Sequence, residues 1–392
     1  MAFSARTVRS LTAVAALSVL AVVTAGAEQP GRMAQEAACT AQADWGVAPS
    51  RLTLLARGFN LTGWFDRVPA QPPSMPVLAS LHARGFTHVR LPITAERLAD
   101  AFAGRPGAAR LLSELDRAID GLIALGFAVT IDMHPGDRIA NLEIGAPERA
   151  FELLDTLWQM LARRYADRPA ERLFFEVLNE PTADPAVWAA YGPRLAATIR
   201  RQAPNHTIIY PPASYQRIDA LADLAPLADL NVVYAVHFYD PLVFTHQGLD
   251  WAGDDPLRHL DGVPFPAKIT DPAVARMIKR LQTEGHAESA IRLKAALELP
   301  WTEPRIDQEF AGAAAWASRH RRPVILNEFG VLQGKAGGMD RLRWLGAVRA
   351  AAERHCVGWA HWEYADGFGF VQRVDGREVP DPAVVDALLG GR

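Results

Sequence analysis

Two glutamates, Glu180 and Glu328, each follow a short apolar run and an asparagine, in the segments FFEVLNEP (174–181) and PVILNEFG (323–330). An apolar run that stops at a carboxylate is typical of a buried parallel strand. The carboxyl ends of such strands form the rim where α/β sheets and barrels keep their active sites. Two carboxylates at one rim can act as proton donor and as nucleophile or base, the pair that glycosidic bond cleavage requires. A single Asn-Glu is more simply a strand-end acid, but the repetition favours chemistry.

The runs that carry these glutamates are the fourth and seventh of eight expected strands. Branched and aromatic residues gather at 54–59, 88–91, 128–133, 173–178, 207–210, 232–238, 324–327 and 358–362. Amphipathic stretches lie between them, at 75–84, 109–125, 147–165, 185–202, 307–320 and 340–354. Strands that alternate with helices are typical of a parallel sheet, and eight alternations predict an α/β fold of the (β/α)8 TIM barrel type.

One connection, residues 240–306 after the sixth expected strand, is much longer than the others. Connections of this length in a compact domain are usually functional or disordered. We expect a helix at about 272–299 and interpret the segment as a cap beside the active face, with a plain structural insertion as the alternative.

Length and composition favour one large domain, which we expect over residues 28–392. The chain has 392 residues, of which 49% are hydrophobic and 22% charged, so it can bury a large core. Its net charge of −3 gives no basic field for phosphate backbones, so nucleic acid is not an expected partner. We expect a monomer.

Cys39 and Cys356 are the two cysteines of the chain. Cys356 precedes the last expected strand and Cys39 lies before the first, and these strands are neighbours in a closed barrel. A disulfide across that seam and two buried free thiols both remain open. Two cysteines alone cannot build a metal site or a disulfide framework.

The first residues have the pattern of an export signal. Arg6 and Arg9 precede an apolar run at 11–23, and Ala25 and Ala27 provide small residues before a cleavage point. This predicts a secretory signal peptide at 1–27 and a secreted or periplasmic protein, without a membrane span after cleavage. An uncleaved anchor is the alternative, although the run is shorter than the roughly 20 residues of a membrane span.

The ordered motifs resemble glycoside hydrolase family 5, the cellulase-type group of retaining barrels, over nearly the whole mature chain. RGFN (57–60) with Gly63 and Trp64 is similar to the family's first strand, and GFTHVRLP (85–92) to its second. VTIDMH (129–134), FEVLNEP (175–181) and HFY (237–239) resemble the third, fourth and sixth strands. VILNEFG (324–330) and GWAHWEY (358–364) resemble the last two. Each motif is weak alone, but their common order is specific.

The resemblance implies that Glu180 is the acid/base and Glu328 the nucleophile of a retaining double displacement. Their carboxyl groups should then lie about 5 to 5.5 Å apart. Arg90 matches the family's second-strand arginine and would help to keep Glu328 ionised, because a nearby positive charge lowers a carboxyl pKa. The alternative for Arg90 is a salt bridge on the barrel floor with Asp132 or Glu176, which are themselves expected to make paired contacts there.

The same resemblance implies a substrate-binding set, namely Arg90, His134, Asn179, His237, Tyr239 and Trp362. Asn179 would bind the sugar's 2-hydroxyl, and Trp362 would lie beneath the sugar ring, because aromatic faces suit the apolar faces of pyranoses. Tyr239 would touch the nucleophile, and the two histidines would line the cleavage point. Pro135 replaces the glycine that many relatives have after the histidine, which puts the local loop shape of His134 in doubt.

Other residues admit two interpretations each. Glu363 and Asp366 are rival catalytic acids, or instead bind distal hydroxyls or form ion pairs. His246 and Gln247 are candidates for the rim. Further aromatic platforms or plain core residues are Trp64, Trp251 and Phe368.

For the activity, an endo-β-1,4-glucanase that acts on polysaccharide or oligosaccharide without cofactor or metal is the first expectation. β-Mannanase, exo-β-1,3-glucanase and exopolysaccharide-trimming glycosidase share the motifs. A zinc hydrolase would need a His-x-His that the first strand does not offer. A binding protein that has lost catalysis would be expected to lack one of the two glutamates.

Overall fold

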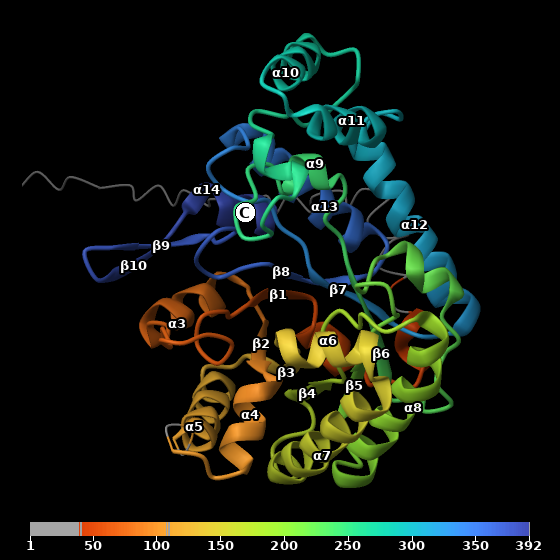
Figure 1. Cartoon of the computed structure of the whole chain (residues 1–392). Helices are drawn as coiled ribbons and strands as arrows, with labels where there is room; N and C mark the ends of the chain where they lie inside the picture. The colour runs from red at the N-terminus through yellow and green to blue at the C-terminus, as the bar shows by residue number, and fades with distance from the viewer. Residues whose placement is uncertain (1–38, 40, 107, 109, 392) are drawn as a thin grey trace, which may run out of the picture.

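The computed structural model describes residue 39 and residues 41–391 apart from 107 and 109. Eight parallel strands form a closed barrel in the order of the sequence, β1-β2-β3-β4-β5-β6-β7-β8 (Figure 1). They are β1 (Arg57–Asn60), β2 (His88–Thr94), β3 (Ala128–His134), β4 (Leu173–Glu176), β5 (Thr207–Tyr210), β6 (Val232–His237), β7 (Val324–Glu328) and β8 (Gly358–His361). The predicted (β/α)8 barrel is confirmed.

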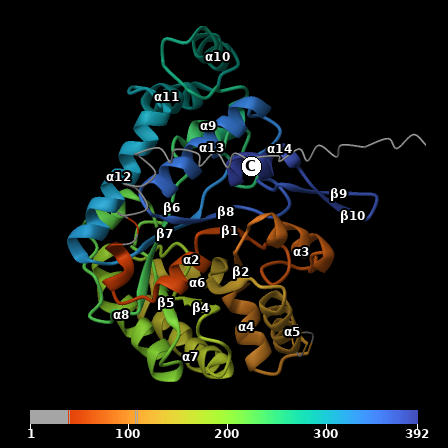
Figure 2. The same cartoon turned by 180° about the vertical axis from the view of Figure 1, so that it is seen from behind.

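The described α-helices are α2 (Pro49–Leu54), α3 (Met75–Arg84), α4 (Ala95–Phe102), α5 (Leu111–Ala124), α6 (Asp137–Gly145), α7 (Pro147–Tyr165), α8 (Pro185–Gln202), α9 (Leu242–Thr245), α10 (Pro272–Thr283), α11 (Ala287–Ala296), α12 (Glu303–His320), α13 (Gly338–Arg354) and α14 (Pro382–Leu389). Most of the helices surround the barrel on its outer side, whereas α2 closes one end of it and α9, α10 and α11 belong to the long connection after β6 (Figures 1 and 2). Short 3-10 helices lie at η1 (Ala41–Asp44), η2 (Asp219–Asp223) and η3 (Pro256–His259). None of the described helices is both long enough and apolar enough to cross a membrane.

Three helix predictions agree with the observed bounds, those of α3, α7 and α8. Their ends carry strong local signals, because proline stands in the first turn of each and Gly85 ends α3 with a left-handed φ of 115°. The first strand is expected at 54–59 but lies at Arg57–Asn60, because residues 49–54 form α2. A short apolar helix that closes the end of the barrel has the same composition as a buried strand, so the sequence does not separate the two.

The long connection departs from the expected single helix. Residues 272–299 form two helices, α10 and α11, separated where Gly285 takes a left-handed φ of 85°. A residue with φ in this region ends a helix. Both helices project from the body of the molecule in both views (Figures 1 and 2).

The barrel interior is arranged in layers, because alternate residues of each strand point inward. The lowest layer is apolar and includes Leu55, Phe174, Val233 and Ile325. The next layer is polar and fully buried, with Asn60, Arg90, Asp132, Glu176 and Asn327. A much larger apolar cluster packs between the strands and the surrounding helices. The apolar layers therefore support a polar one directly below the carboxyl ends of the strands.

Cys39 and Cys356 form a disulfide. Cys356 follows α13 and leads into β8, which pairs with β1 to close the barrel. Of the two possibilities left by the sequence, the disulfide at the seam is therefore correct. A hairpin of β9 (Val371–Val374) and β10 (Arg377–Pro380) extends from the body beyond β8 (Figure 1).

Candidate active site

Arg90 is the centre of the buried polar layer. Its guanidinium donates to both carboxylate oxygens of Glu176 at 2.6 and 2.9 Å, and it lies 3.1 Å from Asp132. It also donates to Glu328 Oε1 at 2.6 Å and to Asn179 Oδ1 at 2.8 Å. Although burial opposes its charge, these carboxylates hold the pKa of Arg90 well above its ordinary value. Both interpretations of Arg90 thus hold at once, because one side chain bonds the floor acids and Glu328.

Arg90 is completely buried and does not line the cleft described below. It contacts Glu328 and Asn179, which do line the cleft, and its expected place among the substrate-binding residues stays a prediction. Arg90 donates to the amide oxygen of Asn179, so the amide nitrogen of Asn179 points away from Arg90 and lies 3.5 Å from His134 Nε2. Arg90 therefore orients two groups that do face the cleft.

Glu328 ends β7, and an irregularity in the β6–β7 pairing brings it inward. Val236 pairs with Leu326, but the next residue, His237, pairs with Glu328, so Asn327 is extra. Strand neighbours normally point to opposite faces, and a bulge breaks that alternation. Asn327 can thus bond Glu176 at 2.7 Å within the barrel while Glu328 Oε2 accepts from the Tyr239 hydroxyl at 2.9 Å.

Glu180 lies beyond the end of β4 in an unusual backbone conformation. Its φ is +44°, which is rare for a residue with a side chain and usually occurs where the surroundings impose it. Its backbone N–H donates to Gln216 Oε1 at 2.7 Å, and its Oε1 lies 2.8 Å from His237 Nδ1. The side chain of Glu180 is 34% exposed, whereas that of Glu328 is 6% exposed.

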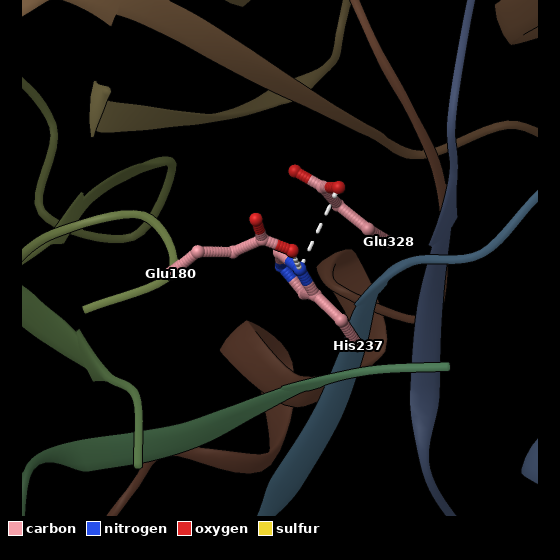
Figure 3. A group of neighbouring side chains, drawn as sticks. All are labelled: Glu180, His237 and Glu328. Carbon is pink, nitrogen blue, oxygen red and sulfur yellow. Dashed lines mark hydrogen bonds and ion pairs between the residues drawn. The ribbon is translucent and has the colours of Figure 1, made fainter. Parts of the chain in front are cut away.

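The two glutamates meet at His237. One oxygen of each carboxylate and one ring nitrogen of His237 all lie within 4.8 Å of one another. Figure 3 shows the imidazole beside both carboxyl groups, with the closer contact to Glu180 and a longer one, 3.5 Å, to Glu328. Two strand ends that are distant in sequence thus bring a carboxylate pair together, as the sequence predicted.

Burial dominates the ionisation of this cluster. It raises the pKa of Glu180 to about 7 and lowers that of His237 to about 4, so the histidine is neutral near pH 7. Burial also raises the pKa of Glu328, but the positive charge of the adjacent Arg90 opposes that shift. Because Glu328 contacts Arg90 directly and Glu180 does not, Glu328 is the carboxyl that ionises more readily.

An open cleft of ≈ 870 Å³ lies above the cluster. Of the eight predicted site residues, only Arg90 does not line this cleft. The seven that do are His134, Asn179, Glu180, His237, Tyr239, Glu328 and Trp362. The rings of His134 and Trp362 stack with centroids 6.1 Å apart, and Asp132 holds His134 through Nδ1 at 2.9 Å. Despite the neighbouring proline, His134 therefore faces the cleft.

Of the aromatic and rim residues with two interpretations, some line the cleft and others do not. Trp251, Phe368 and His246 line the cleft, and Trp251 is 58% exposed. Trp64 stacks on Phe65 with ring centroids 4.9 Å apart and does not line the cleft. Gln247 is fully buried, and its side chain makes hydrogen bonds to the backbone of Phe244 and Val263.

The rival acids Glu363 and Asp366 also line the cleft but have other partners. Glu363 accepts from Thr62 Oγ1 at 2.6 Å, and Asp366 pairs with Arg67 at 2.8 Å. Burial raises the pKa of Glu363 to about 7. Their contacts tie the loops after β1 and β8 together, away from the Glu180–Glu328 pair.

The sequence also matches the model of a known protein family. The model of the cellulase family, glycosyl hydrolase family 5, matches residues 53–365. The chain belongs to glycosyl hydrolase family 5. It is an O-glycosyl hydrolase, and many of its relatives and structural neighbours are named endoglucanases.

Among curated family members, endoglucanase 3 of Fibrobacter succinogenes is 28% identical over 341 residues, which are 81% of this chain and 50% of the relative. This chain therefore spans half the length of that relative. Endoglucanase C of Acetivibrio thermocellus is 24% identical over 325 residues, which are 78% of this chain and 90% of the relative. Among solved structures, a mutant form of Thermotoga maritima Cel5A with cellobiose has a TM-score of 0.70 and 27% identity, covering 88% of this chain and 100% of its own.

Within this family 5 site, sequence reasoning missed Gln216 and Tyr215, which follow β5. Gln216 is fully buried and, besides accepting from Glu180, donates to Glu176 at 3.2 Å and to Asn327 at 3.3 Å. Ser214, Tyr215 and Gln216 have consecutive φ values of 60°, 60° and 58°. No glycine marks this left-handed turn, so the sequence carries no local signal for it.

Proposed function

We propose that this glycosidase is a retaining endo-β-1,4-glucanase with Glu180 as acid/base and Glu328 as nucleophile. The observation that carries the proposal is the carboxylate pair, whose nearest oxygens lie within 4.8 Å. Retaining enzymes hold their carboxyl groups about 5 to 5.5 Å apart, whereas inverting enzymes need about 6.5 to 9.5 Å to admit a water. The short separation supports direct attack by one carboxylate.

The surroundings of the two acids support the assignment of roles. Glu328 accepts hydrogen bonds from Arg90 and Tyr239, which stabilise a carboxylate, so it suits the nucleophile. Glu180 has a pKa raised to about 7 and no arginine contact, so it can hold a proton. In the first step Glu328 bonds to the anomeric carbon while the glycosidic C–O bond breaks, and Glu180 gives its proton to the departing oxygen, so the leaving sugar departs as an alcohol. In the second step Glu180 takes a proton from a water molecule whose oxygen bonds to the anomeric carbon, and the bond to Glu328 breaks, which releases the sugar and restores both carboxyl groups.

The side chains around the pair supply binding. The amide nitrogen of Asn179 faces the cleft and suits a sugar 2-hydroxyl, a contact that strengthens in the transition state. Trp362 offers an aromatic face for the ring, beside the polar His134. Neutral His237 can donate from Nδ1 to Glu180 once that acid has lost its proton.

The β-1,4-glucan assignment is supported by the relatives, which are named endoglucanases. β-Mannan is the second candidate, because Thermotoga maritima Cel5A, at 26% identity, has structures with mannotriose as well as with cellobiose. Exo-β-1,3-glucanase and exopolysaccharide-trimming activities share the same strand-end residues. An inactive binding role is disfavoured, since both glutamates are present and paired.

We further propose that the enzyme is exported and acts as a monomer on polysaccharide outside the cytoplasm. The expected signal peptide at 1–27 lies outside the described residues. The Cys39–Cys356 disulfide supports export, because disulfides persist in oxidising compartments. N-terminal sequencing of protein recovered from the extracellular or periplasmic fraction tests this, and a mature chain that begins near Glu28 is expected.

The activity test is reducing-sugar release from β-1,4-glucan, mixed-linkage glucan, mannan, xylan and β-1,3-glucan by wild type beside Glu328→Ala. Release from β-1,4-glucan by wild type alone is expected, and preference for mannan would replace the glucanase assignment. If the panel stays silent with folded protein, an exopolysaccharide substrate or a binding role takes its place. Because Glu180, His237 and Glu328 also have the spacing of metal ligands, dialysis against a chelator belongs in the test and should leave the rate unchanged.

A further inference from the structure

A second cavity, of ≈ 400 Å³, adjoins the cleft and is built partly by the long connection of this chain. Its walls come from the loops after β5 and β6, from α11 and from the start of α12. Arg217, Asp240 and Leu242 line both this cavity and the cleft. The two spaces are therefore neighbours that share one wall, and a ligand that extends along the cleft in this direction meets the second cavity.

The barrel order places this cavity on the side of the leaving group. Glu180 follows β4, and Arg217 and Asp240 follow β5 and β6, the next two strands around the barrel. Arg67 and Asp366 line the cleft from the opposite side, after β1 and β8. The acid protonates the oxygen of the departing sugar, so that sugar and the units beyond it lie toward the β5 and β6 loops.

The cavity has a mixed lining of apolar and charged side chains, and its charges balance. It is lined by three arginines and three acids, namely Arg217, Arg292, Arg305, Asp219, Asp240 and Glu309. Balanced charge favours a neutral ligand over an ion, and guanidinium and carboxylate groups suit the paired hydroxyls of sugars. Its volume lies within the range of about 300 to 1,000 Å³ that small-ligand sites occupy.

Part of this hydrogen-bonding capacity is unused. Glu309 on α12 is half-buried and makes no hydrogen bond or ion pair with the residues that the structure describes. Arg305 stacks over Trp301, 3.9 Å from the ring centroid, and donates to the backbone of Leu299 at 3.2 Å, which leaves most of its N–H groups available. Arg217, on the shared wall, is held by Asp219 and Asp240 at 3.1 Å each.

We propose that this cavity is a distal sugar-binding subsite for neutral β-linked units on the leaving-group side of the cleft. The proposal rests on the proposed glucanase function and extends it to this chain's own insertion. The nearer part of the 240–306 connection lines the cleft, through His246 and Trp251, and the farther part, α11, builds the subsite. Long glucans gain these contacts, whereas a substrate that ends at the first leaving group does not reach them.

The test compares cellohexaose with an aryl β-cellobioside, whose small aryl group occupies the place of the first leaving sugar. Ala296→Trp fills the cavity from α11, and the ratio of kcat/KM for cellohexaose to that for the aryl substrate should fall about tenfold. Ile291→Trp is the matched control, because Ile291 lies on the same helix, is 65% exposed and is no part of the lining. Its ratio should equal that of wild type.

Glu309→Gln provides a second variant that removes charge without adding bulk, and its ratio should fall about threefold. An unchanged ratio in both folded cavity variants, with normal wild-type turnover of both substrates, overturns the subsite and leaves the glucanase assignment intact. If wild type turns over neither substrate while Glu328→Ala behaves identically, the glucanase assignment fails and the subsite fails with it.

Discussion

Glu180 and Glu328 share one cluster but differ in their immediate partners, and this difference is where the chemistry can be tested. Glu328 bonds Arg90 and Tyr239, whereas Glu180 bonds His237 and is partly exposed. A nucleophile is needed for every substrate, but a proton donor is needed most when the leaving group is poor.

We expect Glu328→Ala to abolish measurable turnover of every substrate. Glu180→Ala should lose about 10² to 10⁴ in kcat on polysaccharide and much less in the first step with an activated aryl leaving group. Burst kinetics with an aryl cellobioside, beside steady-state rates on polymer, measure the difference. Equal losses of Glu180→Ala on both substrate classes would contradict its role as the acid.

The pKa of Glu180 predicts the alkaline limb of the pH profile. Glu180 must be protonated for the first step, and its pKa is raised to about 7 by burial, so kcat/KM should fall as pH rises through about 7. The acid limb should report protonation of Glu328. In Glu180→Gln, assayed with an activated aryl substrate, the alkaline limb should disappear, and its persistence would assign it to another group.

Gln216 bonds the backbone of Glu180, and we propose that it positions this residue. Gln216→Met keeps the volume but leaves the Glu180 N–H without its acceptor and removes two donors to Glu176 and Asn327. We expect kcat on polymer to fall about tenfold, with a smaller loss on an activated aryl substrate, because a buried unpaired N–H costs about 1 to 3 kcal/mol. The exposed Gln282→Met on α10 is the matched control. A purely structural role would reduce both substrates equally and leave the alkaline limb unchanged.

At the scale of elements, the loops and short helices on the active face contain buried carboxyls besides the proposed catalytic pair. Glu143 on α6 is 5% exposed and accepts from Thr182, which follows Glu180 by two residues. It thereby links α6 to the loop that carries the acid. Burial raises the pKa of Glu143 to about 7.

This link should make the stability of the protein pH-dependent. A raised carboxyl pKa means that the folded state keeps a proton that the unfolded state releases. The contribution of Glu143 to the free energy of unfolding is therefore complete below about pH 4.5 and is lost as pH rises through about 7. Glu143→Gln should reduce the fall of the unfolding free energy over this range by up to about 1.4 kcal/mol per pH unit. Urea unfolding at several pH values measures the slope, with the exposed Glu152→Gln on α7 as control. A slope identical to wild type would mean that Glu143 is not the titrating group.

At the scale of the whole molecule, the barrel is closed by β1 and β8, and the disulfide lies at that closure. Cys39 and Cys356 are separated by 317 residues, so their bond restricts nearly the whole unfolded chain. The double variant Cys39→Ser, Cys356→Ser should lose about 2 to 5 kcal/mol of unfolding free energy while keeping its activity at low temperature. A reducing agent should lower the Tm of wild type but not that of the double variant. Alkylation of two thiols in unreduced wild type would contradict the bond.

The sequence by itself determined the barrel, the two glutamates and most of the residues around them. These features have local causes, since buried strands, helix ends and strand-end acids are written in short apolar runs, prolines and glycines. Only the tertiary structure decided how Arg90 bonds both the floor acids and Glu328, how the bulge at Asn327 turns Glu328 inward, and that Gln216 bonds the backbone of Glu180. It also divided the 240–306 connection into a part that lines the cleft and a part beyond it. Such contacts join residues from strands far apart in the sequence, and their geometry depends on closure of the whole barrel.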